Sequence, residues 1–162
     1  MRALLTLFFG FALTSHAGSI LVIFSPSSTL DGQPGQTLDF VGTLTDTDPD
    51  LSAPEYINSD SYNLVGLPLD DSPFLSNAPI FLIPGQVSNP FLMFRVPIPV
   101  AQPLGLYSGT FTVIGGQDGG DGSAQQPIGT GNFTVNVVPE PSTTLLLGAG
   151  LITLLRCRRK RT

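Results

Sequence analysis

The sequence predicts an all-β protein whose folded part is a single antiparallel sandwich of about seven strands. Short runs of alternating apolar and polar residues recur through the middle of the 162-residue chain, and turn-forming glycine, proline, asparagine and aspartate residues separate them. The same region has no convincing helical repeat of apolar residues. Because a chain of this length has room for one domain, we expect the strands to share one core.

The expected domain covers residues 18–137, and its strands follow one another along the chain, the last ending at residue 138. They cover residues 19–24, 37–45, 62–67, 80–83, 91–96, 106–114 and 131–138, and the expected loops cover residues 70–79 and 117–126. Pro97 and Pro99 restrict the fifth strand to a sheet edge or end it there. The large residues expected in the core are Phe24, Phe40, Phe81, Phe91, Phe94, Tyr107, Phe111 and Phe133.

The sandwich is expected to resemble immunoglobulin domains only in the broad sense. The chain has no tryptophan and a single cysteine, Cys157, so the disulfide and the tryptophan of antibody domains are both missing. The sequence Gly105-Leu106-Tyr107 before the sixth strand resembles the tyrosine corner of such sandwiches, which gives Tyr107 a structural role.

The residues between the two ends exclude several kinds of active site. Residues 18–141 contain no histidine, cysteine, lysine or tryptophan, so a Ser-His-Asp triad, a Schiff-base lysine, a zinc site and a disulfide framework are all excluded. We therefore identify no catalytic residues and expect a protein that is not an enzyme. The region holds all twelve acidic residues but only one basic residue, Arg95, and its net charge of −11 excludes nucleic acid as a partner.

The N-terminus is typical of a secretory signal peptide covering residues 1–17. Arg2 supplies a positive charge, residues 3–13 are mostly apolar, and Ser15 and Ala17 place small residues at the positions that signal peptidase requires for cleavage between Ala17 and Gly18. The sequence therefore predicts export through the secretion machinery.

The C-terminus, residues 138–162, contains three zones in order. An extended Pro-Glu-Pro motif (138–141) precedes an uncharged stretch (142–155) and a basic tail (156–162). The 14 uncharged residues would form a helix of roughly 21 Å, short of a hydrocarbon core of about 30 Å. The basic tail nevertheless indicates a membrane helix whose tail stays in the cytoplasm, since arginine side chains can reach the interface and the bilayer can thin locally.

This order of motif, short span and basic end resembles the PEP-CTERM sorting signal of Gram-negative bacteria. In that family an exosortase, a membrane-embedded enzyme, recognises the signal, and the exported proteins are associated with exopolysaccharide, biofilm or floc formation. The resemblance implies that Pro139, Glu140 and Pro141 are the recognised motif. It also implies a membrane span of Leu145, Leu146, Leu147, Gly148, Ala149, Gly150, Leu151, Ile152, Leu154 and Leu155, and a basic stop of Arg156, Arg158, Arg159, Lys160 and Arg161.

Two further features are candidate binding sites. Asp46, Asp48 and Asp50 follow a predicted strand at a spacing of two, and carboxylates that converge in a loop bind calcium, so the alternatives are a calcium site and a solvated turn. We expect no cofactor other than calcium at this site. A row of hydroxyl side chains, Ser108, Thr110 and Thr112, is a candidate for contact with sugars, and the alternative is an ordinary outward strand face.

The leading hypothesis is an exported, non-enzymatic protein of the cell surface or extracellular matrix. Its precursor would be held in the inner membrane and processed by an exosortase-type system. One alternative is a calcium-dependent or carbohydrate-binding adhesion module. The other is a single-pass membrane protein that is never cleaved.

Overall fold

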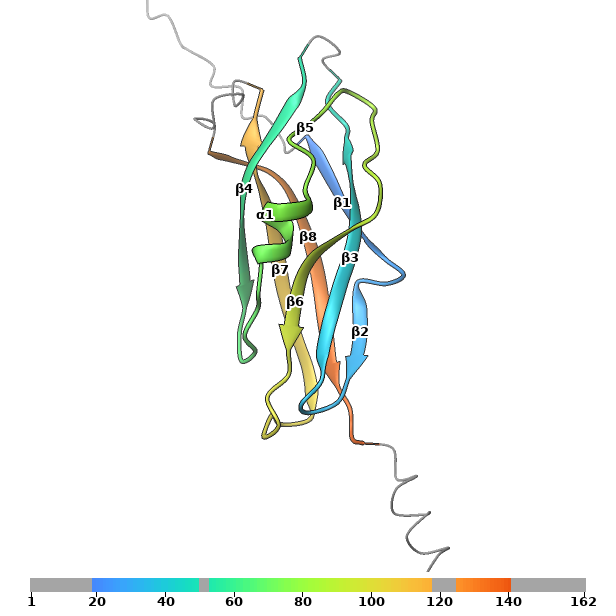
Figure 1. Ribbon diagram of the computed structural model, residues 1–162, viewed down its shortest axis with the longest axis vertical. Helices are drawn as coiled ribbons and strands as arrows, with labels where there is room; N and C mark the ends of the chain where they lie inside the picture. The colour runs from blue at the N-terminus through green and yellow to red at the C-terminus, as the bar shows by residue number, and fades with distance from the viewer. Residues whose placement is uncertain (1–18, 50–52, 118–124, 141–162) are drawn as a thin grey trace, which may run out of the picture.

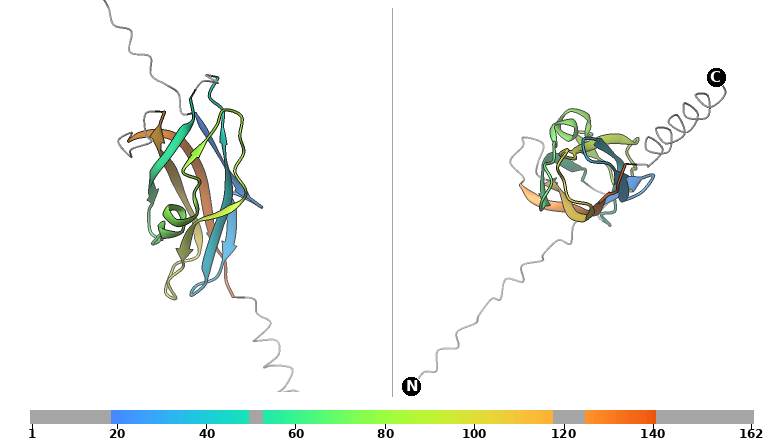
Figure 2. Two further views of the ribbon diagram at one scale, coloured as in Figure 1. Left: turned by 45° about the horizontal axis from the view of Figure 1, so that its top comes forward. Right: turned by 90° about the horizontal axis from the view of Figure 1, so that it is seen from below.

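Two β-sheets face each other in the computed structural model, which describes residues 19–49, 53–117 and 125–140 (Figure 1). The first sheet has the order β1 (Ile20–Ser25), β3 (Thr37–Asp46) and β6 (Phe91–Pro97). The second has the order β2 (Thr29–Gly32), β8 (Gln126–Val137), β7 (Gly105–Gly116), β4 (Glu55–Leu64) and β5 (Phe81–Leu82). The predicted all-β class is confirmed, and the end-on view in Figure 2 shows how the two sheets enclose the core.

The topology differs from the prediction in three details. The described residues form eight strands where about seven were predicted, and the additional strand is the four-residue β2. This strand pairs in parallel with β8, whereas the other pairings are antiparallel. A short helix, α1 (Ser72–Asn77), lies where the sequence predicted a loop.

Three strands have the alternation that the sequence indicated. In β3, Leu38, Phe40, Gly42 and Leu44 all face the core, and in β8 the same holds for Phe133, Val135 and Val137. In β7, Phe111 and Val113 are fully buried, whereas Thr110 and Thr112 lie on the opposite face. These strands alternate because each has one face on the core and the other in water.

The centre of the core is a group of five phenylalanines that joins the sheets. Phe24, Phe40 and Phe94 come from the first sheet, and Phe111 and Phe133 come from the second. The ring of Phe94 stacks on Phe40 at a centroid distance of 4.8 Å and on Phe111 at 4.9 Å. Its centroid also lies 5.8 Å from that of the Phe24 ring, in a T-shaped arrangement. All five were predicted as core residues, and their mutual contacts make this cluster the main apolar link between the sheets.

The prediction that Phe81 belongs to the core was wrong. Its side chain is 47% exposed, because β5 is a two-residue edge strand that turns this ring outward against Tyr56. Phe74 of α1 fills the core instead, at 1% exposure and 5.1 Å from the ring of Phe111.

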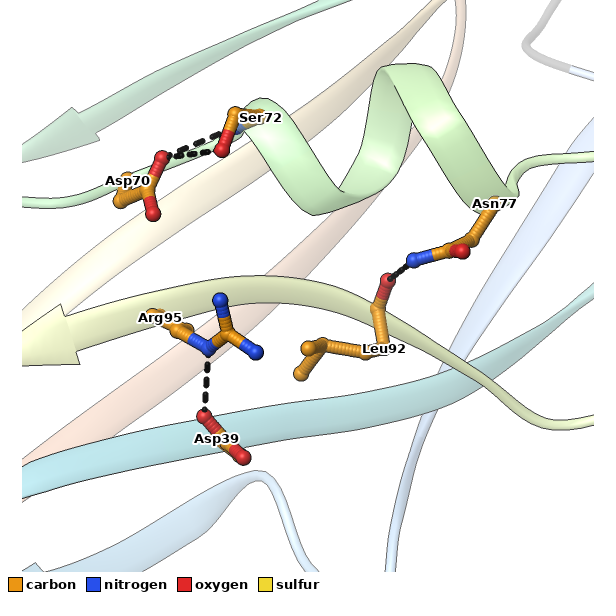
Figure 3. Close-up of polar contacts among 6 residues, drawn as sticks. All are labelled: Asp39, Asp70, Ser72, Asn77, Leu92 and Arg95. Carbon is orange, nitrogen blue, oxygen red and sulfur yellow. Dashed lines mark hydrogen bonds and ion pairs between the residues drawn. The ribbon is translucent and has the colours of Figure 1, made fainter.

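Helix α1 is fixed in the opening between β4 and β6 by polar contacts at both of its ends (Figure 3). Asp70 accepts a hydrogen bond of 2.6 Å from the Ser72 hydroxyl, and the Asn77 amide donates to the carbonyl of Leu92 at 3.3 Å. Pro73 lies in the first turn, where its missing N–H is not needed. The helix thus closes one side of the sandwich with the Phe74 ring beneath it.

Arg95 is the only basic residue among those the structure describes, and it belongs to β6. Its Nε donates to Asp39 of β3 at 3.1 Å, and the two residues are directly paired across the strands (Figure 3). Both side chains are about half exposed, so the pair favours this register but adds little to stability.

The predicted tyrosine corner is present at the start of β7. The Tyr107 hydroxyl donates to the carbonyl of Pro103, four residues earlier, at 2.8 Å. This bond closes the connection between β6 and β7, which crosses from one sheet to the other.

We expect Tyr107→Phe to lower the free energy of unfolding by about 0.5–1.5 kcal/mol, because it removes this hydrogen bond and keeps the ring. Urea unfolding of the full chain in detergent measures the change. Tyr62→Phe is the matched control, since the Tyr62 hydroxyl makes only a long contact of 3.3 Å with the Leu69 carbonyl. A loss no larger for Tyr107 than for Tyr62 would contradict the structural role of the corner.

Candidate functional site

The first residues of the predicted sorting motif leave the fold directly from its last strand. Val137 ends β8 and is 2% exposed, in register with Gly105 of β7 and Gly32 of β2. Val138 makes one further hydrogen bond, from its N–H to the carbonyl of Gly32 at 2.9 Å. The chain therefore remains part of the sheet up to the residue before the motif.

Pro139 and Glu140 are both exposed. Proline has no N–H to donate to a strand ladder, so Pro139 ends the pairing that Val138 still makes. The Glu140 carboxylate lies beyond it, on the surface. A processing enzyme can therefore reach these two motif residues without unfolding the sandwich.

Several predicted residues lie outside the described ranges. These are Ala17, Gly18, Asp50, Pro141, the span 142–155 and the basic tail 156–162. In the part of the chain that the structure covers, no helix is long and apolar enough to cross a membrane.

The predicted calcium residues Asp46 and Asp48 lie together at the opposite end of the sandwich. Asp46 is 1% exposed and Asp48 is 6% exposed. One Asp46 carboxylate oxygen accepts the Asp48 N–H at 2.9 Å, and Asp48 accepts a hydrogen bond from the Gln117 amide at 2.8 Å. Burial raises the pKa of Asp46, and the charge of Asp48 raises it further against the effect of that backbone bond.

The hydrogen bond between Asp48 and Gln117 links the turn after β3 to the residue that follows β7. The second carboxylate oxygen of Asp46 has no hydrogen-bond partner among the described residues. Within the same residues, no group of three or more histidine, cysteine, aspartate or glutamate side chains could hold a metal ion. The described geometry is therefore that of an aspartate turn, and calcium binding that involves Asp50 stays a prediction.

The outer face of the second sheet carries a shallow hollow of about 300 Å³. Its lining is uncharged and consists of Asn63, Val65, Ser108, Gly109, Thr110, Asn132, Phe133 and Thr134. The hydroxyl groups of Ser108 and Thr134 lie 3.3 Å apart, as expected for directly paired residues of β7 and β8. The sequence indicated the hydroxyl row of β7. It did not indicate Asn63, although residues 62–67 are a predicted strand, because local sequence does not show the pairing of β4 with β7 that places Asn63 beside Thr110.

An acidic pair that the sequence analysis missed lies between β4 and the start of α1. Burial, together with the nearby charge of Asp71, raises the pKa of Asp60 to about 6. One Asp60 oxygen is buried and has no hydrogen-bond partner in the described part of the chain. The two residues are eleven positions apart in the sequence, so only the position of α1 shows that they are neighbours.

The exposed motif at the end of a closed sandwich defines a class of protein: a folded cargo with a C-terminal sorting signal. The pattern of the PEP-CTERM protein-sorting motif matches residues 137–160. The predicted resemblance is thereby confirmed for this segment. The motif implies an exported protein with a C-terminal membrane-anchoring signal, which an exosortase recognises and processes at the membrane.

Comparison with curated proteins finds no match in sequence. Among solved structures, the PapD-like domain 7 of human CEP192 is 8% identical, with a TM-score of 0.40 and coverage of 85% of this chain and 99% of that domain. The CaCohA2 structure from Clostridium acetobutylicum is 13% identical, with a TM-score of 0.36 and coverage of 75% and 92%. WR4, a C. elegans MSP family member, is 12% identical, with a TM-score of 0.35 and coverage of 76% and 100%. These are similarities of fold alone.

Proposed function

We propose that this protein is a non-enzymatic component of the cell surface or the secreted polysaccharide matrix, released from a membrane-held precursor by an exosortase-type enzyme. The observation that supports this most directly is the motif at residues 137–160, in which Pro139 and Glu140 are exposed just after the last strand. The absence of histidine, cysteine and lysine from residues 18–141 supports a binding or structural role.

The sorting step is tested by the mass of the protein's C-terminus in cells with and without the exosortase. We expect a shortened C-terminus only in cells that contain the enzyme. In those cells we expect Glu140→Gln to leave most of the protein with its full tail, because the variant removes the charge of the recognised motif. The matched control is Asp31→Asn, which neutralises an exposed acid on β2.

Intact tails in both kinds of cell would contradict processing. They would favour the alternative of a permanent single-pass anchor. A tail lost equally in both would instead show that another protease removes it.

A second candidate function is binding of a neutral polysaccharide at the hollow on the second sheet. The hollow is lined by hydroxyl and amide side chains, which can both donate and accept hydrogen bonds, as sugar hydroxyls do. Its lining includes no charged residue, and the strongly acidic domain would repel an anionic polymer. The exposed Val65 at its edge offers an apolar contact for a sugar ring.

We expect the double variant Thr110→Val and Asn132→Ala to weaken binding of a neutral exopolysaccharide fraction about tenfold, because it removes two paired polar groups. Calorimetry with the full chain measures the affinity. Thr43→Val, on the first sheet, is the control and should leave the affinity unchanged. Equal affinities for both variants would place the contact elsewhere.

A further inference from the structure

The two ends of the sandwich differ in charge. The end that holds the β3–β4 connection contains the buried acids Asp46, Asp48 and Glu55. The opposite end holds the 33–36 turn, the 98–104 connection and the end of β8, at the bottom of Figure 1. Hydrogen bonds place these three segments side by side, from the Gly35 N–H to the Ile98 carbonyl at 2.8 Å and from Val138 to Gly32 at 2.9 Å. We call this end the exit end, because the chain leaves the sandwich there.

The loops of the exit end carry no charge and expose large apolar side chains. Residues 32–38 and 96–117 contain no acidic or basic residue, in a chain where all twelve acids lie between residues 31 and 140. Within the 96–117 segment, Val100 is 83% exposed, Leu106 is 71% exposed and Leu104 is 55% exposed. Three such residues within seven positions form an apolar surface; Val100 and Leu104 lie in the connection that the tyrosine corner closes, and Leu106 lies at the start of β7.

The length of chain beyond the sandwich limits how far this end can lie from a membrane. Val138 is the last residue bonded to the sheet, and the uncharged stretch of the sorting signal begins at residue 142. Four residues span at most about 14 Å, even when fully extended. The headgroup layer on each side of a bilayer is about 5–8 Å thick. Until the signal is removed, the exit end is therefore confined to the region just above the lipid headgroups.

We propose that the exit end rests on the membrane before processing, with Val100, Leu104 and Leu106 seated among the lipid headgroups. Apolar side chains gain free energy from entering this layer, and the segment 96–117 that carries them has no acid for anionic lipids to repel; the nearest exposed acids are Asp31 of β2 and Glu140. The acid-rich end then points away from the membrane. This inference rests on the sorting assignment and adds an orientation to it: the Pro139–Glu140 segment is held at the membrane surface, where an integral membrane enzyme can act on it.

The chain has no tryptophan, so a single introduced tryptophan reports on its own surroundings. We would place Val100→Trp at the exit end and Val87→Trp, whose native side chain is 58% exposed, near the acid-rich end as the matched control. Each full chain is reconstituted in vesicles of phosphatidylcholine and phosphatidylglycerol with brominated acyl chains. We expect blue-shifted emission that the bromine quenches for Trp at position 100, and unshifted, unquenched emission at position 87. Leu104→Trp is a second reporter that should behave like the first.

Carbonate extraction of the same vesicles tests the membrane anchor separately from the orientation of the sandwich. If the variants resist extraction but tryptophan at positions 100 and 104 is as exposed as tryptophan at position 87, the proposed orientation is wrong and the membrane anchor is supported. If carbonate removes the chain from the vesicles, the protein is not anchored in the membrane, and both the anchoring part of the sorting assignment and the proposed orientation are wrong. If the reporters become shielded only when exosortase is added to the vesicles, the surface contacts the enzyme and the lipid proposal is wrong.

Discussion

Replacing Phe94 with alanine is expected to lower the free energy of unfolding by about 3–5 kcal/mol. The side chain is fully buried, and its ring contacts Phe24, Phe40, Phe111 and Phe133 at centroid distances between 4.7 and 5.8 Å. Alanine removes the ring from the centre of the cluster that joins the sheets, and neighbours held on two separate sheets cannot close the cavity fully. Urea denaturation of the full chain in detergent measures the loss.

The matched control is Phe81→Ala, which removes the same atoms from a ring that is 47% exposed. It should cost much less, since little buried volume is emptied. Phe94→Leu should cost less than Phe94→Ala, because it retains part of the apolar volume. Equal losses at positions 94 and 81 would mean that the inter-sheet cluster does not hold the sandwich together.

Replacing Asp60 with asparagine is expected to stabilise the protein at pH 7.5 by about 1–3 kcal/mol. Burial and the charge of Asp71 raise the pKa of Asp60 to about 6 in the folded protein, from an ordinary value of 3.8. At neutral pH the folded state therefore holds a carboxylate that is partly stripped of water and repelled by its neighbour. Asparagine has the same shape as the protonated acid and removes that charge.

The pH dependence follows from the direction of the shift. Since the folded-state pKa lies above the unfolded one, the favourable contribution of Asp60 is fully present below pH 3.8 and is lost as the pH rises through about 6. The gain from Asp60→Asn should therefore appear in thermal melts at pH 7.5 and vanish at pH 3.5.

Asp70→Asn is the control of opposite sign. Hydrogen bonds from the hydroxyl and N–H of Ser72, with a smaller effect of Arg95, hold the pKa of Asp70 below its usual value. Neutralising this residue should therefore reduce stability at pH 7.5. A stabilisation by Asp70→Asn, or an Asp60→Asn gain that persists at pH 3.5, would contradict the electrostatic explanation.

The strands that could be predicted from sequence are those with one buried face and one solvent-exposed face. In β3, β7 and β8, alternating positions such as Phe40, Phe111 and Phe133 point into the core, and their polar neighbours make the period visible. Strand β4 covers Glu55–Leu64, whereas the sequence predicts a strand only from residue 62. In the part that was not predicted, only Glu55 and Ile57 are buried, one of them is an acid, and residues 58–61 are all polar, so there is little apolar alternation to detect.

Short elements were missed for a related reason. Helix α1 has six residues, fewer than two turns, and its two buried residues, Pro73 and Phe74, are adjacent, so they cannot show a helical period. Strand β2 has four residues, and they pair with a strand about a hundred positions away. The sequence around β2 does not indicate this pairing. Phe81 was assigned to the core because it is large and apolar, but only the fold shows that it lies on an edge.

The candidate sites also differ in whether the sequence alone could predict them. The sorting motif was predicted because its residues are contiguous, and so were the two aspartates of the β3 turn. The Asp60–Asp71 pair and the hollow that includes Asn63, Thr110 and Asn132 are assembled from separate elements. Such sites become visible only once the pairing of the strands is known.

The position of β8 between β2 and β7 sets the timing of maturation. This interior strand connects both of its neighbours to the sheet, and it is the last strand of the described fold, directly before the sorting signal. The second sheet cannot form completely until Val137 is available to pair with Gly32 and Gly105, and the matched sorting motif begins at this same residue. If the exosortase acts on this signal as proposed, the strand that completes the domain precedes the signal along the chain, and the enzyme meets a protein that is already folded.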